Sequence, residues 1–423
     1  MLNFIVNSIL FLLLSEAFFL CSVAATTGKT LWSTSITDET YYYSLISVES
    51  SIFYAGTLGL VQGCHVDGYD IFSGKLIKNI SDVCVVSNKD TDISGFGSIG
   101  YEFPDLTIFY TDSKYQWKDQ IVGRQYYPAY YESIVTRDDF VYIWGMEPTK
   151  GGSDEIACVY TLTTLTGTLT RGPCLQDIGT GQGADIISVS GDGKVVLLTA
   201  GFKAEIYDFN KDTLEFTIRY NISAGYSTVA SLSHDGNNFA IGTAQGIAYY
   251  SYNGSTYMET IVIPPLDQTS LTIEGLVFSK ESPNPLLVAY YTWDDGEYYQ
   301  WAVAAYDTKS NGKKLWEFDS IRAASKYTDT IDSISVTDNG ELVVVGSWGS
   351  ELNINPQVHV FEGWNGTSAP VYTLSTAGSV MAVSAAKVRG TTSRFAIGVS
   401  SLAHHENVSI KGGYATLILI DLD

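Results

Sequence analysis

Long apolar runs, sustained helical periodicity and an excess of positive charge are all missing from this chain, and each absence excludes a class of protein. Beyond residue 25 no apolar stretch reaches the about 20 residues that a membrane-spanning helix needs. After the first 20 residues no segment repeats apolar residues at helical spacing, which argues against a helical bundle. Lys and Arg number 24 against 46 Asp and Glu, for a net charge of −22. That charge argues against nucleic acids and anionic membranes as partners, and it favours solubility.

Catalytic and metal-binding motifs are also missing. The sequence contains no GxSxG, HExxH or P-loop motif, and no GxGxxG that follows a strand. Its five cysteines form no CxxC pair and no Cys/His spacing typical of zinc. Neighbouring carboxylates such as Asp294 and Asp295 fit glycoside chemistry, but acids are too common here for one pair to carry weight. We therefore predict no catalytic residue, no metal site and no cofactor from the motifs.

What the chain does contain is typical of short strands joined by tight turns. It has 29 Tyr, 18 Phe, 8 Trp and 39 Gly, but only 10 Pro. The clearest unit runs from strand Ile186–Ser190 through the turn Gly191–Lys194 to strand Val195–Thr199, with two further strands before residue 224. The same order recurs around His234–Asn237 and Asp338–Glu341. Asp-Gly and Asn-Gly suit turns that need positive φ, so these acids are interpreted as turn residues rather than calcium ligands.

Extending this pattern predicts a β-propeller, because about 40–50 residues with four strands is the usual blade repeat. Eight units follow, and seven if the irregular second unit merges with a neighbour. Their ranges are 41–84, 91–128, 131–178, 184–224, 227–268, 272–322, 329–376, and 379–423 completed by 26–38.

The two ends of the chain together make one repeat. The C-terminal IDLD followed by TTGKTLW (residues 26–32) aligns without a gap on Tyr306–Trp316. A repeat divided between the termini is what a closed ring requires, because the first strand then completes the last blade and removes its open edge. We predict a single propeller domain over residues 26–423.

Residues 1–25 are interpreted as a secretory signal peptide. Ile9–Leu14 is apolar, and Ser22–Ala25 offers small residues for cleavage, although the segment has no Lys or Arg and Glu16 interrupts it. An uncleaved anchor is the alternative. The expected location is outside the cell or in the lumen of the secretory pathway.

Cysteines and sequons agree with that location. Cys64 and Cys84 bracket the predicted turn Phe72–Lys75, and Cys158 and Cys174 bracket Leu165–Thr168, so the hairpins would bring each pair within disulfide reach. Buried free thiols are the alternative. Five sequons predict N-glycosylation, although several arise by chance in a chain so rich in Asn, Ser and Thr; they are at Asn79, Asn221, Asn253, Asn365 and Asn407.

Strand ends and turns resemble those of known propellers. The segments AEIYDF (204–209) and AAYDT (304–308), with TGKTLW (27–32) and NGKKLWEF (311–318), resemble the quinoprotein-dehydrogenase-like superfamily. The turns Ser190–Gly193 and Ser233–Gly236 resemble those of WD40-like propellers. In the family the Trp packs between blades and the Asp caps a turn. The resemblance implies, as an alternative function, an oxidoreductase that uses pyrroloquinoline quinone with calcium. The chain lacks the vicinal Cys-Cys of many such enzymes, and no catalytic residue is carried over.

One face of the predicted ring carries unusual loops. Strand 2–3 connections are long at Gly145–Ile156, Tyr291–Trp301, Ser347–Val358 and Ser400–Tyr414. They are rich in aromatic and acidic residues, which favours a binding scaffold for a protein, cationic peptide or glycan, in a monomeric protein. The alternative is that the aromatics pack the loops down. The candidate binding residues are Trp293, Asp294, Asp295, Tyr298, Trp301, Trp348, Glu351, His404 and His405.

Overall fold

Short antiparallel strands make up almost all of the protein's regular structure. The computed structural model describes residues 27–36, 48–49, 52–57, 65–81, 90–91, 95–99, 105–110, 116–120, 131–137, 139–148, 155–163, 166, 168–176, 186–200, 203–223, 229–266, 271–280, 284–294, 299–319, 334–347, 357–376, 379–388, 390–402 and 413–422. Within these ranges the helical structure is confined to one 3₁₀ turn, η1 (Thr308–Ser310). No helix of the described part is long and apolar enough to span a membrane.

The strands form eight sheets in the described ranges, and six of these sheets join only strands that are consecutive in the chain. Two of these six come from the first third of the chain: β2 (Val48–Glu49), β3 (Ile52–Thr57), β4 (His65–Asp70), β5 (Leu76–Ser81); and β7 (Gly95–Ile99), β8 (Asp105–Tyr110), β9 (Gln116–Gln120). Two follow in the middle: β14 (Ile186–Val189), β15 (Val195–Ala200), β16 (Lys203–Asn210), β17 (Glu215–Ser223); and β18 (Ala230–Leu232), β19 (Asn238–Thr243), β20 (Gly246–Tyr252), β21 (Tyr257–Ile263). The last two are β22 (Thr272–Phe278), β23 (Leu286–Asp294), β24 (Tyr299–Asp307), β25 (Lys313–Asp319); and β26 (Ile334–Val336), β27 (Leu342–Gly346), β28 (Val358–Glu362), β29 (Tyr372–Leu374).

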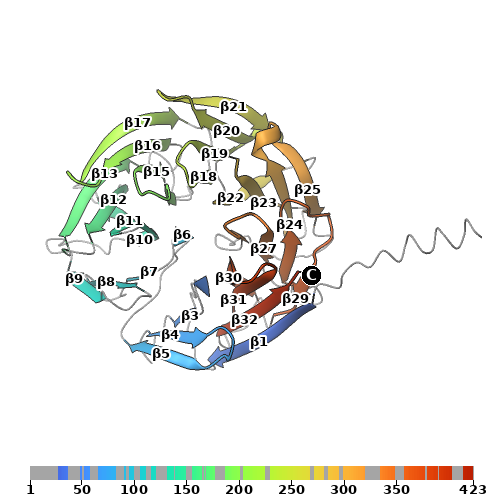
Figure 1. Ribbon diagram of the computed structural model, residues 1–423. Helices are drawn as coiled ribbons and strands as arrows, with labels where there is room; N and C mark the ends of the chain where they lie inside the picture. Colours follow the sequence, from blue (N-terminus) through green and yellow to red (C-terminus); the bar gives the residue numbers. More distant parts are fainter. Residues whose placement is uncertain are drawn as a thin grey trace, which may run out of the picture.

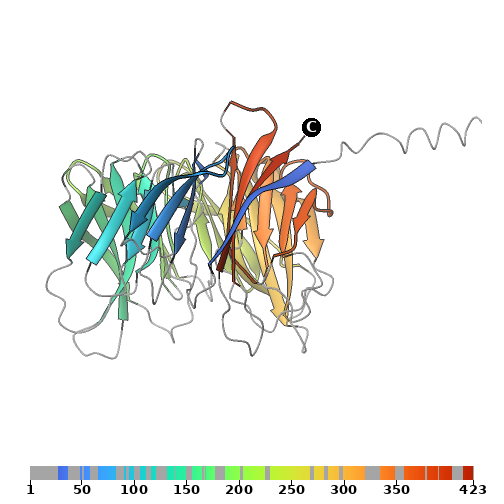
Figure 2. The same ribbon diagram turned by 90° about the horizontal axis from the view of Figure 1, so that it is seen from below.

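The remaining two sheets contain strands from distant parts of the chain. One has the order β13 (Thr168–Gln176), β12 (Glu155–Thr163), β11 (Phe140–Pro148), β10 (Tyr131–Arg137), β6 (Asp90–Thr91), and the other β1 (Thr27–Ile36), β32 (Gly413–Asp421), β31 (Arg394–Leu402), β30 (Ser379–Lys387). The sheets succeed one another around an axis in chain order, and in side view their strands cross the thickness of the molecule side by side (Figures 1 and 2). This is a propeller-like all-β fold.

The sheets match the repeat units expected from the sequence. Seven of the eight sheets each lie within one expected unit, with β1 counted in the last unit, and the second unit, the least regular in sequence, has three strands in the described residues. One pairing was not expected: the short strand β6 runs parallel to β10, with Asp90 opposite Val135. A short segment at the border of the first and second units is therefore linked by backbone hydrogen bonds to the sheet of the third unit.

The first strand joins the last sheet, as the divided repeat predicts. β1 pairs antiparallel with β32, from Thr27 opposite Asp421 to Ile36 opposite Gly413. The blue and dark-red ends of the chain consequently lie side by side (Figure 1). The register differs from that of the intact repeat by two residues, because Lys29 faces Leu419 whereas the aligned Lys313 faces Asp307. A shift of two keeps each residue on the same face of the strand.

The same bulge recurs in the outermost strand of several sheets. In the pairing of the third and fourth strands, one residue of the fourth strand has no partner on the third. Such an extra residue is a β-bulge, which bends the strand and increases its twist. The skipped residues are Ile77, Arg219, Thr260, Leu315 and, in the closing strand, Leu31. That Leu31 and Leu315 occupy the same position in the aligned GKTLW and GKKLW segments shows that β1 is structurally a fourth strand.

Turn chemistry fixes the connections between first and second strands. The Ser190 hydroxyl donates to Asp192 Oδ1 at 2.7 Å and accepts from Val195 N at 2.9 Å, while Gly193 has φ +68°. Ser233 and Asp235 repeat these contacts in the next sheet. This confirms that the acids of these turns are structural.

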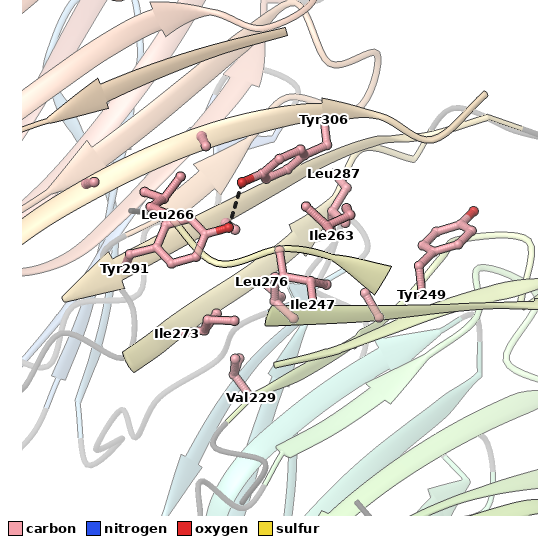
Figure 3. Packing of buried hydrophobic residues seen from close by; sticks show 14 of the residues in the cluster. Val229, Ile247, Tyr249, Ile263, Leu266, Ile273, Leu276, Leu287, Tyr291 and Tyr306 are labelled. Atoms are coloured by element: carbon pink, nitrogen blue, oxygen red, sulfur yellow. Dashed lines mark hydrogen bonds between the residues drawn. The ribbon is translucent and has the colours of Figure 1, made fainter. Parts of the chain in front are cut away.

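Neighbouring sheets pack face to face through apolar side chains. The cluster between β18–β21 and β22–β25 includes the buried residues Ile247, Ile273 and Leu287 (Figure 3). Tyr291 and Tyr306 also lie in it and join their hydroxyls at 2.7 Å. Burial raises the pKa of Tyr306 to about 12, so the pair stays neutral and satisfies its own polar atoms.

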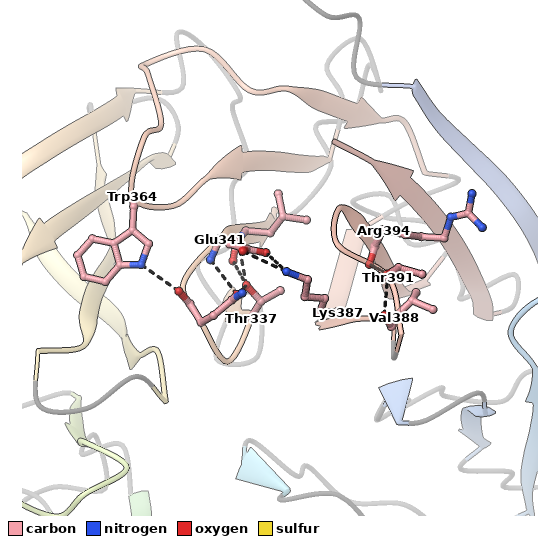
Figure 4. A network of polar contacts seen from close by, with 9 residues as sticks. Thr337, Glu341, Trp364, Lys387, Val388, Thr391 and Arg394 are labelled. Atoms are coloured by element: carbon pink, nitrogen blue, oxygen red, sulfur yellow. Dashed lines mark hydrogen bonds and ion pairs between the residues drawn. The ribbon is translucent and has the colours of Figure 1, made fainter. Parts of the chain in front are cut away.

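Polar contacts tie the sheets together where the 1–2 turns lie. Lys387 of β30 donates to both carboxylate oxygens of Glu341, at 2.8 and 3.1 Å, and Trp364 donates to Asn339 O at 2.9 Å (Figure 4). Between another pair of sheets, the buried Arg137 donates to Val189 O and Ser190 O. The Lys387 and Arg137 contacts fix adjacent sheets relative to one another, whereas the Trp364 contact joins two turns of one sheet.

Two structural contacts expected for the Trp and the Asp of the strand-end motifs are present. Trp316 is buried, stacks on Phe361 of the next sheet at 5.0 Å and donates to Gly363 O. Asp307 accepts from Lys309 N at 2.9 Å and so caps η1.

Cysteine pairing is confirmed for Cys158 and Cys174, which are opposite each other in the β12–β13 hairpin and form a disulfide. Cys64 and Cys84 lie outside the described residues.

Candidate functional site

The candidate site is the end of the sheets where second strands turn into third strands, above all the β23–β24 hairpin. Its register runs from Leu286 opposite Asp307 to Asp294 opposite Tyr299. Strand pairing therefore continues through most of the segment Tyr291–Trp301 that the sequence analysis takes as a loop. Trp293 and Asp294 lie on β23 at the end of the hairpin, and the connection shortens to residues 295–298, which include Asp295 and Tyr298 and lie outside the described residues.

Trp293 and Trp301 come from opposite strands and face opposite ways. Thr292, not Trp293, is the partner of Trp301 in the register, so the two indoles are on different faces of the sheet. Trp293 is half-buried and packs against the cluster that contains Tyr291. Next to it, the Thr292 hydroxyl donates to Glu274 Oε1 at 3.3 Å. One side of Trp293 is therefore held by the cluster around Tyr291, while part of the side chain stays exposed at the end of the sheet.

Trp301 is a core residue, so its placement among the loop residues was wrong. Only 3 % of it is exposed. Its ring stacks on Tyr290 at 5.7 Å and meets the His359 ring edge-on at 5.1 Å. The second interpretation, in which aromatics pack down, therefore holds for this residue. The physical reason is that the pleat directs Trp301 into the contact between β22–β25 and β26–β29.

His359 of β28 completes this contact between two sheets. It is buried beside Trp301 and Phe318, with ring centroids 5.1 and 5.2 Å away. Its Nδ1 has no hydrogen-bond partner within the described part of the chain. Burial lowers the pKa of His359 to about 4, so the imidazole is neutral at physiological pH. His359 is therefore a structural residue of the contact between the sheets.

A second polar cluster supports the connection that follows β27. Ser347 N donates to Gln357 O at 2.8 Å, and the Gln357 side-chain oxygen accepts from Thr376 N at 2.8 Å. These bonds fix both ends of the segment 348–356, which contains Trp348 and Glu351 and lies outside the described residues. The same holds for His404 and His405, in the connection between Leu402 and Gly413.

Sequence reasoning missed the buried polar groups under this face. Gln300 and Gln357 are both buried, and the carboxyl group of Asp319 has a raised pKa, mainly because of burial, with the neighbouring Glu317 adding to it. The only sequence signal for these buried groups was that Gln300 and Gln357 stand next to apolar strand residues. In the described residues no three His, Cys, Asp or Glu side chains converge on one point. The arrangement provides a rigid support of buried aromatic and amide side chains beneath the connections between second and third strands.

No protein-family model matches the chain, and no curated protein matches it. Among solved structures, a protein from Lactobacillus plantarum aligns with 13 % identity over 74 % of this chain and 92 % of its own, with a TM-score of 0.44.

Proposed function

We propose that this chain is a secreted, monomeric β-propeller that binds a partner through the end of the ring where second strands turn into third strands. Residues 1–25 act as its signal peptide, and residues 26–423 form one domain of eight four-stranded blades closed by the N-terminal strand. The pairing of β1 with β32 supports closure. The disulfide Cys158–Cys174 is compatible with an oxidising compartment.

The β23–β24 hairpin carries the argument for binding. Trp293 and Asp294 are held at the end of a paired hairpin whose base is anchored by the buried Trp301 and His359. A partly exposed ring on a rigid support loses little entropy on binding, which is why such residues recur in interfaces. Trp348, Glu351, His404 and His405 come from the equivalent connections of the next two blades. The chemistry favours a cationic peptide or protein segment, or a glycan stacked on the indoles.

The test is capture of partners from the secreted fraction by the wild type and by Trp293→Ala with Trp348→Ala, at low and high salt. We expect the double variant to lose its partner; a cationic partner also weakens with salt, because screening shortens to about 8 Å near physiological ionic strength, and a glycan does not. Phe72→Ala is the matched control, since Phe72 is 54 % exposed in a strand 3–4 turn on the opposite face. A double variant that keeps every partner would refute the site.

The resemblance to quinoprotein dehydrogenases provides the second candidate, an oxidoreductase that binds pyrroloquinoline quinone with calcium. Calcium needs several converging oxygen ligands, and the described residues contain no group of three or more acidic, His or Cys side chains that could supply them. The described part of the chain therefore does not fit the cofactor, and no reaction step is derived from it. Reconstitution with the quinone and calcium, followed by dye-linked alcohol oxidation, separates the two functions.

A further inference from the structure

Large apolar side chains are exposed on the outer edges of three sheets. In a propeller the fourth strand of each sheet is an edge strand, and β5, β17 and β21 lie at the rim of the molecule (Figure 1). The exposed residues are on these strands or in the turn before β5, and each is close to half exposed: Phe72, Leu76, Ile77, Ile218, Met258 and Val262. Unpaired edges that expose apolar groups are templates for self-association.

Two of these edges carry the same tripeptide at the same register position. Asn-Ile-Ser occurs at residues 79–81 on β5 and at 221–223 on β17. Asn79 pairs with Asp67 and follows the bulged Ile77 by two residues. Asn221 pairs with Glu205 and follows the bulged Arg219 by two residues. Two chance sequons would not be expected at one structural position next to exposed apolar residues.

Asn221 shares a face of β17 with the apolar residue it would cover. The partners of Ile218 and Asn221 on β16 are Tyr207 and Glu205, which are two residues apart and therefore on one face. Ile218 is 52 % exposed, and Asn221 is exposed as well. A group attached to Asn221 would extend over the same side of the edge strand as Ile218.

The third edge has its sequon in the turn that leads into β21. Asn253 is exposed, and its amide nitrogen donates to the sulfur of Met258 at 3.1 Å. Its Oδ1 accepts from the Ser255 hydroxyl at 2.9 Å, so the two side chains that define the sequon are in contact. Gly254 has φ +95°, and a Cβ built there would meet nothing within 4 Å, which shows that the turn projects into open space.

We propose that N-linked glycans at Asn79, Asn221 and Asn253 cover the apolar outer edges of these three sheets and keep the protein monomeric. The inference rests on the proposed secretion, since the donor is an oligosaccharide on a lipid diphosphate in that pathway. The amide nitrogen of Asn attacks the anomeric carbon, an N–C bond forms, the C–O bond to the diphosphate breaks, and the nitrogen loses one proton. None of the three sequons lies in a strand 2–3 connection, where the binding site is proposed.

The experiment starts from the full chain secreted by eukaryotic cells. Peptide mapping after enzymatic release, which converts each glycosylated Asn to Asp, is expected to show occupied Asn79, Asn221 and Asn253. Releasing the glycans from the folded protein is then expected to raise its mass in light scattering above that of the monomer. Leu76→Thr, Ile218→Thr and Met258→Thr together are expected to restore the monomer after release, because they remove the exposed apolar groups and keep β propensity.

The matched control is the sequon of Asn365, an exposed residue in the β28–β29 connection. Thr367→Ala removes that glycan alone and is expected to leave the mass unchanged. Secreted protein with bare Asn221 and Asn253, or a monomer that persists after release, overturns this inference while the proposed function stands. A chain retained in the cytosol without any glycan overturns both. Glycan release acts on folded protein, so misfolding of a variant cannot hide either result.

Discussion

The two ends of each blade are built differently. At the strand 1–2 end, short turns are closed by hydroxyl and carboxylate contacts such as those of Ser190 and Asp192, and Arg137 ties one turn to the neighbouring sheet. At the strand 2–3 end, the half-buried Trp293 packs on the cluster that contains Tyr291, and on the other face of the hairpin Trp301 meets the buried His359. The first end therefore contributes to stability through satisfied polar groups, whereas the second keeps a partly exposed aromatic side chain, which the proposed function uses for recognition.

Removing the closing strand should have the largest effect of any change. Deletion of residues 26–38 takes away β1 and leaves β32 as an open edge. We expect loss of cooperative unfolding and strong aggregation, measured by thermal denaturation. A truncated protein that melts at the wild-type temperature would show that β1 is not part of the ring's stability.

The two tryptophans of the β23–β24 hairpin sharpen the comparison within one sheet. Trp301→Ala should destabilise the protein by about 3–5 kcal/mol, because it removes a buried indole from the contact with Tyr290 and His359. Trp293→Ala should cost no more than about 1 kcal/mol, because half-buried residues lose less on truncation. Denaturant titration of both variants decides the order, and equal losses would mean that Trp293 is a core residue too.

Acid should weaken the contact between sheets at His359. Burial lowers its pKa to about 4 in the folded protein, whereas an unfolded His titrates near 6.5. The folded state therefore binds fewer protons between these values, so its contribution is complete above pH 6.5 and is lost as pH falls toward 4. The loss amounts to about 3 kcal/mol at 1.36 kcal/mol per pKa unit. In His359→Phe, the free energy of unfolding measured by denaturant titration should change less between pH 6.5 and pH 4. If the variant keeps the wild-type pH dependence, His359 is not the cause of the acid destabilisation.

Removing one turn hydroxyl should have the smallest effect. Ser190→Ala takes a partner from Val195 N and from Asp192, which should destabilise the protein by about 1–2 kcal/mol. Thermal melts measure the change, with the exposed Ser73→Ala in another turn as a milder comparison. Partner capture should be unaffected, since the site is at the opposite end. Loss of binding in Ser190→Ala at full stability would contradict the division between the ends.

Much of the fold could be predicted because its signals are local. Apolar strands with Asp-Gly or Asn-Gly turns identify the clearest units, and the divided repeat identifies β1 as the partner of β32. The hairpin around residue 166 places Cys158 opposite Cys174 for the same reason. The parallel pairing of β6 with β10 was not predictable, because two residues carry no pattern of their own.

The candidate site was less predictable because burial at a strand end depends on the neighbouring sheet. Trp293 and Trp301 are similar in local sequence, yet Trp301 meets His359 of another sheet and is buried. No single-sequence pattern reports that contact. The equivalence of Asn79 and Asn221 likewise depends on the bulges at Ile77 and Arg219, which appear only in the strand registers.

Hydrogen exchange of the protein with and without its captured partner tests the central claim most directly. We predict new protection in peptides that cover 291–301 and 347–358, at the strand 2–3 end. Peptides that cover the turns at 190–195 and 233–238 should exchange slowly in both states, because their amides are already bonded. New protection confined to those turns, with none at the β23–β24 hairpin, would contradict the assignment of recognition to the strand 2–3 end.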